Sequence, residues 1–186
     1  MHILYIFISY LLGNILMAAI VGKVKGVNLQ HVNSGNLGAR NAGRTLGKLA
    51  FVIVAVGDAF KGAVVVWAGR MLEFSEPIIA LAGIAVVLGH LYPFWNKGKG
   101  GKGVATVVGA MLLFSPLYTI GLIVGFLGGM LLTRSATLSM VVGFTLYGVL
   151  VSWKLEGGII LCIALLFVIW KQRKSIIERV MPNVLE

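Results

Sequence analysis

Residues 77–115 read PIIALAGIAVVLGHLYPFWNKGKGGKGVATVVGAMLLFS, and this stretch decides the fold. Two apolar runs flank a short segment that holds three lysines and four glycines. A soluble domain would spread polar side chains over each of its elements, whereas here they are concentrated between the runs. The pattern therefore indicates helices that cross a membrane and are joined by short cationic connections.

The composition of the whole chain supports this interpretation. Apolar residues make up 59% of the 186 residues, and the mean hydropathy is +0.97. Charged residues make up 12%, against the ~25% typical of soluble domains. The chain cannot supply a polar surface for a soluble fold of its length. We predict an all-α polytopic integral membrane protein, in which the net charge of +10 reflects membrane topology rather than nucleic-acid binding.

The number of spans follows from the apolar runs, several of which are shorter than the ~20 residues that a clean span needs. We expect about seven transmembrane helices, with five spans plus shorter interfacial or re-entrant pieces as the alternative. Either odd number places the two termini on opposite sides of the membrane. The runs lie near 3–22, 49–70, 77–92, 103–115, 117–133, 138–153 and 158–170.

The basic residues then set the orientation. With seven spans, 13 of the 16 Lys and Arg residues lie on one side, and only Arg70 and Lys154 lie on the other. Lys61 lies inside a span. The positive-inside rule places the glycine-rich connections and the C-terminus in the cytoplasm, and the N-terminus outside. No basic residue precedes the first apolar run, which argues against a cleaved signal peptide. Residues 1–186 are expected to form a single transmembrane domain.

The connection 23–48 contains the first candidate site, SGNLGARNAGR at residues 34–44. Glycines let backbone N–H groups turn toward an anion, and Arg binds phosphate through two parallel hydrogen bonds. The alternative is a flexible loop whose charges serve topology alone. Residues 38–45 nearly match a P-loop and residues 98–103 match a dinucleotide fingerprint, but neither lies in the strand–loop–helix context that those motifs require.

The segment that begins at His90 is the second candidate. His90 ends an apolar run just before Pro93 and the three lysines, so it serves either as a polar cap or as part of an anionic-ligand site. Topology accounts for the lysines but not for the four glycines. The glycines imply that some group approaches this backbone closely.

Asp58 and Lys61 form the third candidate, inside the second run. An ionisable residue within the membrane is a functional candidate by default, and the i, i+3 spacing puts both side chains on one helix face. The alternative is a structural pair that neutralises itself. Arg134, Thr137 and Arg173 are weaker candidates near helix ends. Together these features predict a cationic pocket at the cytoplasmic face that binds a phosphorylated small molecule, beside helices that hold an acyl chain.

The motifs described above resemble those of a known family. SGNLGARNAGR, Asp58 with Lys61, and GHLYPFWNKGKGGKGVAT occur in the order seen in the bacterial acyl-phosphate:glycerol-3-phosphate acyltransferases, the PlsY family. The resemblance covers nearly the whole chain. It implies seven helices in the bacterial inner or plasma membrane, with the site at the cytoplasmic face. The implied reaction transfers a fatty acyl group from acyl phosphate to the 1-hydroxyl of glycerol 3-phosphate, and it releases lysophosphatidic acid and inorganic phosphate.

The resemblance also implies roles for particular residues. Ser34, His90 and Lys102 are the expected catalytic residues. The expected partners are acyl phosphate, glycerol 3-phosphate and membrane lipid, with no metal, cofactor or nucleic acid. The expected substrate- and phosphate-binding residues are Gly35, Asn36, Gly38, Asn41, Arg44, Asp58, Lys61, Lys99, Gly100, Gly101, Gly103, Thr106, Arg134, Thr137 and Arg173.

The chain departs from the family pattern at several positions. Asn33 replaces the usual glycine, and Arg40 replaces the usual threonine. The serine-bearing segment that follows Arg134 is reduced to residues 137–139. The usual His-Arg-x-Asn of the tail is Gln-Arg-Lys-Ser at residues 172–175. Arg40 adds a cation beside the expected phosphate site. These changes leave a different acceptor, or a catalytically reduced paralogue, as alternatives.

The expected chemistry needs little covalent help from the protein. Acyl phosphate is a mixed anhydride with a good leaving group, so binding two anions side by side and aiming the hydroxyl supply most of the catalysis. The His-x-x-x-x-Asp motif of other acyltransferases is absent, because Asn36 and Trp95 stand five residues after His31 and His90. His90 and a substrate phosphate oxygen are the alternative bases. Ser34 as a nucleophile ranks lower. A transporter for a phosphorylated solute is the main competing function.

Overall fold

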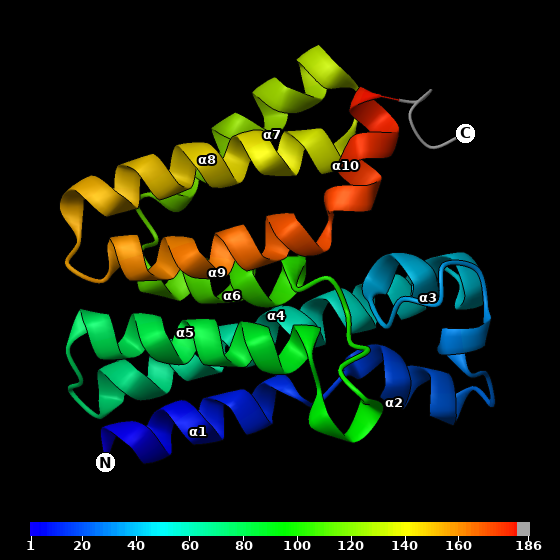
Figure 1. Cartoon of the computed structure of the whole chain (residues 1–186), viewed down its shortest axis with the longest axis horizontal. Helices are drawn as coiled ribbons and strands as arrows, with labels where there is room; N and C mark the ends of the chain where they lie inside the picture. Colours follow the sequence, from blue (N-terminus) through cyan, green and yellow to red (C-terminus); the bar gives the residue numbers. More distant parts are fainter. Residues whose placement is uncertain (182–186) are drawn as a thin grey trace.

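The computed structural model describes residues 1–181, and this part of the chain is helical with no strands (Figure 1). The expectation of an all-helical fold is confirmed. Two short 3₁₀ turns, η1 (Leu29–His31) and η2 (Phe94–Asn96), lie in the connections. The α-helices are α1 (His2–Gly13), α2 (Met17–Val24), α3 (Ala39–Leu46), α4 (Lys48–Met71), α5 (Glu76–Leu91), α6 (Val104–Phe114), α7 (Thr119–Thr133), α8 (Ala136–Lys154), α9 (Gly158–Lys171) and α10 (Arg173–Val180).

Each of the seven predicted apolar runs contains an apolar helix. Four helical segments are long and apolar enough to cross a membrane: His2–Val24, Lys48–Met71, Glu76–Asn96 and Ala136–Lys154. The other three, Val104–Phe114, Thr119–Thr133 and Gly158–Lys171, are apolar but shorter.

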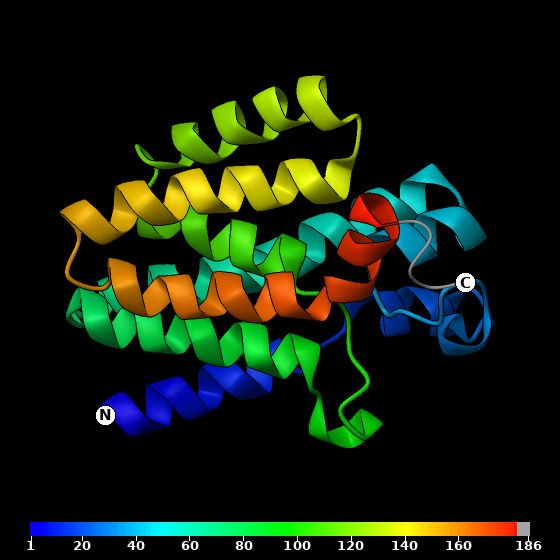
Figure 2. The same ribbon diagram turned by 45° about the horizontal axis from the view of Figure 1, so that its top comes forward.

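The helices pack as a bundle in which α7 lies along one edge and α1 along the opposite edge (Figure 2). α1 packs on α5, α4 packs on α6, α5 packs on α9, and the α7–α8 hairpin joins the bundle through α9. The α4–α6 crossing is close, since a Cβ at Gly109 would lie 1.9 Å from the backbone oxygen of Ala59. Phe144 and Tyr147 of α8 are the largest side chains in the buried core. Close approach at small residues is typical of helix packing in membranes.

The first apolar run differs from the prediction of one continuous span. α1 ends at Gly13 and α2 begins at Met17, so the run is broken around Asn14. The break frees backbone carbonyl groups, and the ammonium of Lys61 donates to the oxygens of Gly13, at 3.0 Å, and Ile15, at 2.6 Å. An internal cation thus supplies the hydrogen bonds that the interrupted helix cannot.

Two short helices lie outside the predicted apolar runs, one in the connection 23–48 and one in the C-terminal tail. Residues 39–46 form α3, where Asn41 and Ala42 are buried while Arg40 and Arg44 are exposed one turn apart. Alanine, arginine and leucine favour helix, and burial of one face stabilises it. α10 follows α9 after a turn at Gln172.

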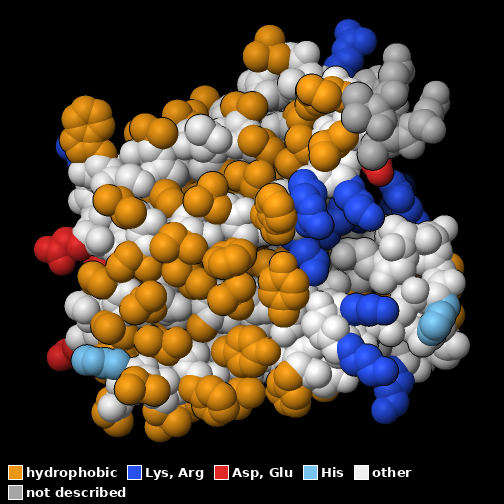
Figure 3. All heavy atoms as spheres, viewed as in Figure 1, with side chains coloured by type: hydrophobic (Ala, Val, Ile, Leu, Met, Phe, Trp, Pro, Cys, Tyr) orange, Lys and Arg blue, Asp and Glu red, His pale blue; other side chains and the backbone are white. Residues whose placement is uncertain are grey.

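Charged side chains are distributed unevenly over the bundle. Figure 3 shows hydrophobic side chains covering most of the helical surface, with Lys and Arg gathered at the end that carries α2, α3 and α10.

Candidate functional site

Lys102 lies at the cationic end of the bundle, in the glycine-rich loop before α6. Its ammonium donates to Ser175 Oγ at 2.8 Å and to Gln172 Oε1 at 3.3 Å. These two acceptors come from α10 and from the turn before it. The tail of the described chain therefore folds back onto the loop and holds the Lys102 side chain.

Two arginines of α3 lie near the same ammonium. Burial lowers the pKa of Lys102 below the ordinary value of 10.5, and the positive charges of Arg40 and Arg44 lower it further, while Glu178 opposes them. Arg40 also reaches the start of α8, where its Nη1 lies 3.4 Å from Thr137 Oγ1. We call Arg40, Arg44 and Lys102 the cation cluster. Its like charges repel one another, so the cluster favours the binding of an anion.

The glycines of the loop are explained by the protein itself. A Cβ at Gly101 would lie 2.1 Å from His90 Nε2 and 2.8 Å from the backbone oxygen of Leu37. The Gly101 amide donates to the His90 carbonyl at 3.0 Å, and the Gly100 amide donates to the Leu91 carbonyl at 3.2 Å. Both amides are therefore already used. Within residues 1–181, the first turn of α6 has no capping side chain, so its amides are free to face an anion.

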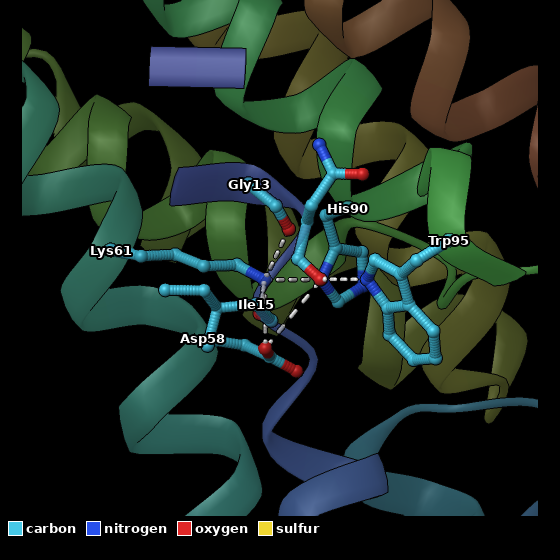
Figure 4. Close-up of polar contacts among 7 residues, drawn as sticks. Gly13, Ile15, Asp58, Lys61, His90 and Trp95 are labelled. Carbon is cyan, nitrogen blue, oxygen red and sulfur yellow. Dashed lines mark hydrogen bonds and ion pairs between the residues drawn. The ribbon is translucent and has the colours of Figure 1, made fainter. Parts of the chain in front are cut away.

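Asp58, Lys61 and His90 meet beneath this loop and form what we call the buried cluster (Figure 4). Lys61 Nζ lies 3.1 Å from Asp58 Oδ1 and 2.8 Å from His90 Nδ1, and His90 Nδ1 lies 3.5 Å from Asp58 Oδ1. All three side chains are almost completely buried. The buried cluster connects the α1–α2 break with the glycine-rich loop. Each of its three residues therefore has a structural role.

Residues 33–38 form the turn that leads into α3. Gly35 and Asn33 both adopt positive φ, at 64° and 53°. Asparagine is among the few residues that tolerate this conformation, which explains how it can stand where the resemblance leads us to expect glycine. The Asn33 side chain donates to Thr45 Oγ1 at 3.0 Å. Ser34 is exposed, and Asn36 and Gly38 continue the turn, with Gly38 as the N-cap of α3.

Other predicted site residues lie elsewhere. The Asn41 amide donates to the Leu29 carbonyl at 2.8 Å and faces inward. Thr106 is buried, and within the described residues its hydroxyl has no partner. Arg134 is exposed in the turn after α7, and Lys99 is exposed in the loop that ends at Gly103, the N-cap of α6. Arg173 lies over Trp170, with 4.6 Å between guanidinium carbon and ring centre.

Three residues that contact the site were missed as site residues. Sequence reasoning assigned the tail contribution to Arg173, whereas Gln172 and Ser175 are the tail residues that hold Lys102. Their i, i+3 spacing places them on one face of the α9–α10 turn. Arg40 was noted only as an added cation. Gln172, Ser175 and Arg40 are all positions at which the chain departs from the expected family pattern. That departure was the feature of the sequence that could have identified them as site residues.

The site and the helices together define an integral membrane protein with a cationic region at one end. The sequence profile of the glycerol-3-phosphate acyltransferase family matches residues 3–182. A glycerol-3-phosphate acyltransferase of Bacillus subtilis is 38% identical over 190 residues, which cover 97% of this chain and 96% of that protein. Glycerol-3-phosphate acyltransferase 1 of Bacillus cereus is 45% identical over 128 residues, 68% of this chain and 70% of that one.

Two solved structures are also similar to this chain over most of its length. The crystal structure of PlsY, an integral membrane glycerol 3-phosphate acyltransferase, in its glycerol 3-phosphate form is similar with a TM-score of 0.88 and 29% identity. The match covers 98% of this chain and 93% of that one. The lysophosphatidic acid form of PlsY matches with a TM-score of 0.87. This chain therefore belongs to the glycerol-3-phosphate acyltransferase family and is an integral membrane acyltransferase, as the sequence predicted.

Proposed function

We propose that this protein transfers a fatty acyl group from acyl phosphate to the 1-hydroxyl of glycerol 3-phosphate, at the cytoplasmic face of a bacterial membrane. The cation cluster carries the proposal. Arg40 and Arg44 of α3 act electrostatically on Lys102, which lies just before the first turn of α6, and that turn has no capping side chain. Such a region suits two phosphate groups held close together, because both substrates of the reaction carry one.

The reaction needs these groups to be placed side by side. The glycerol hydroxyl attacks the acyl carbon, the bond between that carbon and the phosphate oxygen breaks, and phosphate leaves with the bonding electrons. Lys102, Arg40 and Arg44 offset the repulsion between the two anions and stabilise the charge on the leaving phosphate. Positioning of this kind requires no metal and no covalent intermediate.

We assign the proton of the attacking hydroxyl to a substrate phosphate oxygen rather than to His90. The His90 side chain is 3% exposed, its Nδ1 faces Lys61 at 2.8 Å, and its Nε2 lies against Gly101. Neither ring nitrogen is open to a substrate hydroxyl. His90 therefore supports the glycine-rich loop, and Asp58 and Lys61 support His90.

Ser34 acts as a hydrogen-bonding group in this proposal, not as a nucleophile. It is exposed, and within residues 1–181 its hydroxyl contacts no histidine or carboxylate that would activate it. Intact-protein mass spectrometry after incubation with acyl phosphate alone should show no acyl adduct. A stable adduct on Ser34 would overturn this assignment.

An apolar groove between α9 and α10 supports the lipid part of the proposal. It is an open groove of about 620 Å³ whose lining includes Phe167, Trp170 and Ile177, and Arg173 also lines it. A groove with apolar walls and one cation matches an acyl chain that ends in a phosphate. We assign it to the acyl chain of the donor.

Purified protein in lipid, given glycerol 3-phosphate with either acyl phosphate or acyl-CoA, tests the proposal. We expect lysophosphatidic acid and phosphate with acyl phosphate alone. Lys102→Met should reduce kcat/KM by about 100-fold, in the range for losing one transition-state donor. Lys48→Thr removes an exposed cation at the start of α4 and should leave turnover unchanged. Turnover with acyl-CoA only, or solute flux in liposomes without turnover, would contradict the proposal.

A further inference from the structure

Within residues 1–181, the cation cluster has no carboxylate partner in an ion pair. The lysine–carboxylate ion pair of this part of the chain, Lys61–Asp58, lies in the buried cluster. Glu178 attracts Lys102 electrostatically without forming an ion pair with it. Arg40 and Arg44 are exposed, so water screens most of the repulsion among the three charges, but a multiply charged ligand would gain from all three of them.

The three cations differ in how many of their N–H donors have an acceptor within the protein. The Lys102 ammonium has two oxygen acceptors, Ser175 Oγ and Gln172 Oε1. Arg40 contacts a single neutral hydroxyl, Thr137 Oγ1, at 3.4 Å. A guanidinium carries five N–H donors in a planar fork, so most of the donors of Arg40 are free for another partner. The contact with Thr137 joins α3 to α8 one turn from Met140, whose sulfur contacts Gln172, the residue that also accepts from Lys102.

We propose that Arg40 binds the acceptor's phosphate together with Arg44 and Lys102, and that it makes the site selective for a dianionic phosphate monoester over a monoanionic phosphodiester. This inference rests on the proposed function. Near neutral pH a phosphate monoester carries a charge of roughly −1.5 to −2, whereas a phosphodiester carries a single negative charge. Arg40 therefore attracts the monoester more strongly than the diester, because the attraction scales with the charge of the ligand.

The test compares glycerol 3-phosphate with its methyl phosphodiester, which keeps the reacting hydroxyl and removes one ionisable oxygen. For each acceptor, kcat/KM is measured with acyl phosphate as donor, in wild type, Arg40→Thr and Arg40→Lys. Arg40→Thr should lower kcat/KM for the monoester by about tenfold, mainly through KM, the size expected for one charge-assisted contact. The loss for the diester should be about threefold or less. Arg40→Lys should keep part of the selectivity, because it keeps the charge without the planar fork.

Lys48→Thr is the matched control, because it removes one exposed cation from the neighbouring helix. It should leave the monoester-to-diester ratio at the wild-type value. The unfolding temperature of Arg40→Thr in detergent should equal that of wild type. Equal losses for both acceptors, or no change for either, would overturn the role of Arg40.

Direct binding of glycerol 3-phosphate without donor separates this inference from the proposed function. Protein that binds glycerol 3-phosphate in an Arg40-dependent way but transfers no acyl group would overturn the proposed function and support the role of Arg40. Protein that transfers acyl groups with the same acceptor selectivity in Arg40→Thr would overturn the role of Arg40 alone.

Discussion

At the scale of a single residue, the ammonium group of Lys102 donates to two neutral acceptors and is subject to the positive charges of two arginines. Burial, and then the charges of Arg40 and Arg44, lower its pKa below 10.5. The proton is therefore lost at a lower pH than from an ordinary lysine, and phosphate binding weakens as the pH rises through that lowered pKa. A bound phosphate dianion acts in the opposite direction and raises the pKa of Lys102.

This arrangement predicts an alkaline limb in the pH profile. In wild type, kcat/KM should fall at a pH below 10.5, where Lys102 loses its charge. Lys102→Arg should keep measurable activity and move the fall to higher pH, because a guanidinium stays charged. The profiles are compared in one series of overlapping buffers. An unchanged limb in Lys102→Arg would show that another group controls it.

A second residue-scale prediction concerns Gly101. Gly101→Ala should lower the unfolding temperature and reduce activity by about 100-fold or more, because an added Cβ meets His90 Nε2 and the Leu37 carbonyl. Gly128→Ala is the control, since a Cβ at that position of α7 meets nothing within 4 Å. It should leave activity unchanged and stabilise the helix by up to about 1 kcal/mol. Thermal unfolding and kcat/KM on the same preparations check both variants, and a Gly101→Ala protein with normal stability and turnover would contradict the packing explanation.

At the scale of elements, the buried cluster explains why α1 and α2 are separate helices. Lys61 of α4 bonds to the carbonyls of the break, while Asn14 in the break accepts from the Phe94 amide at 2.8 Å. The Trp95 indole donates to the Asn14 carbonyl at 2.9 Å. The break between α1 and α2 is therefore bonded both to α4 and to η2, at the start of the glycine-rich loop.

The cluster predicts strong coupling between its members. Lys61→Met and Asp58→Asn should each destabilise the protein by about 3–5 kcal/mol, because each leaves an unpaired charge in the interior. The double variant should lose less than the sum of the two single losses. Unfolding of all four proteins in the same detergent measures this cycle. Additive losses would indicate that the two side chains act independently.

The sequence predicted the apolar helices well, because runs of apolar residues are a local signal. It did not predict the break at Asn14, since Gly13, Ile15 and Lys61 become neighbours only after α1 and α4 pack together. The contacts of Lys102 with Gln172 and Ser175 join residues about 70 positions apart, and no local pattern records them. Arg40 was visible as a departure from the family pattern, but its distance to Thr137 was not.

At the scale of the whole molecule, the distribution of Lys and Arg predicts the orientation in the membrane. Lys25→Cys and Lys154→Cys, each made in a Cys162→Ser background, place one thiol at each end of the bundle. In intact cells, a membrane-impermeant maleimide should label position 154 directly and position 25 only after permeabilisation. The reverse pattern would place the cation cluster outside the cytoplasm and remove the proposed site from its substrates.

The contact between α10 and the glycine-rich loop has a consequence for biosynthesis. Lys102 leaves the ribosome roughly 70 residues before the two side chains that hold its ammonium, which at ~5–20 residues per second is several seconds. During that interval α6 to α9 enter the membrane while the cations of the site have no tail to order them. A nascent chain that stalls after α9 would be fully inserted yet lack the finished site, so the onset of activity reports completion of the chain rather than its insertion.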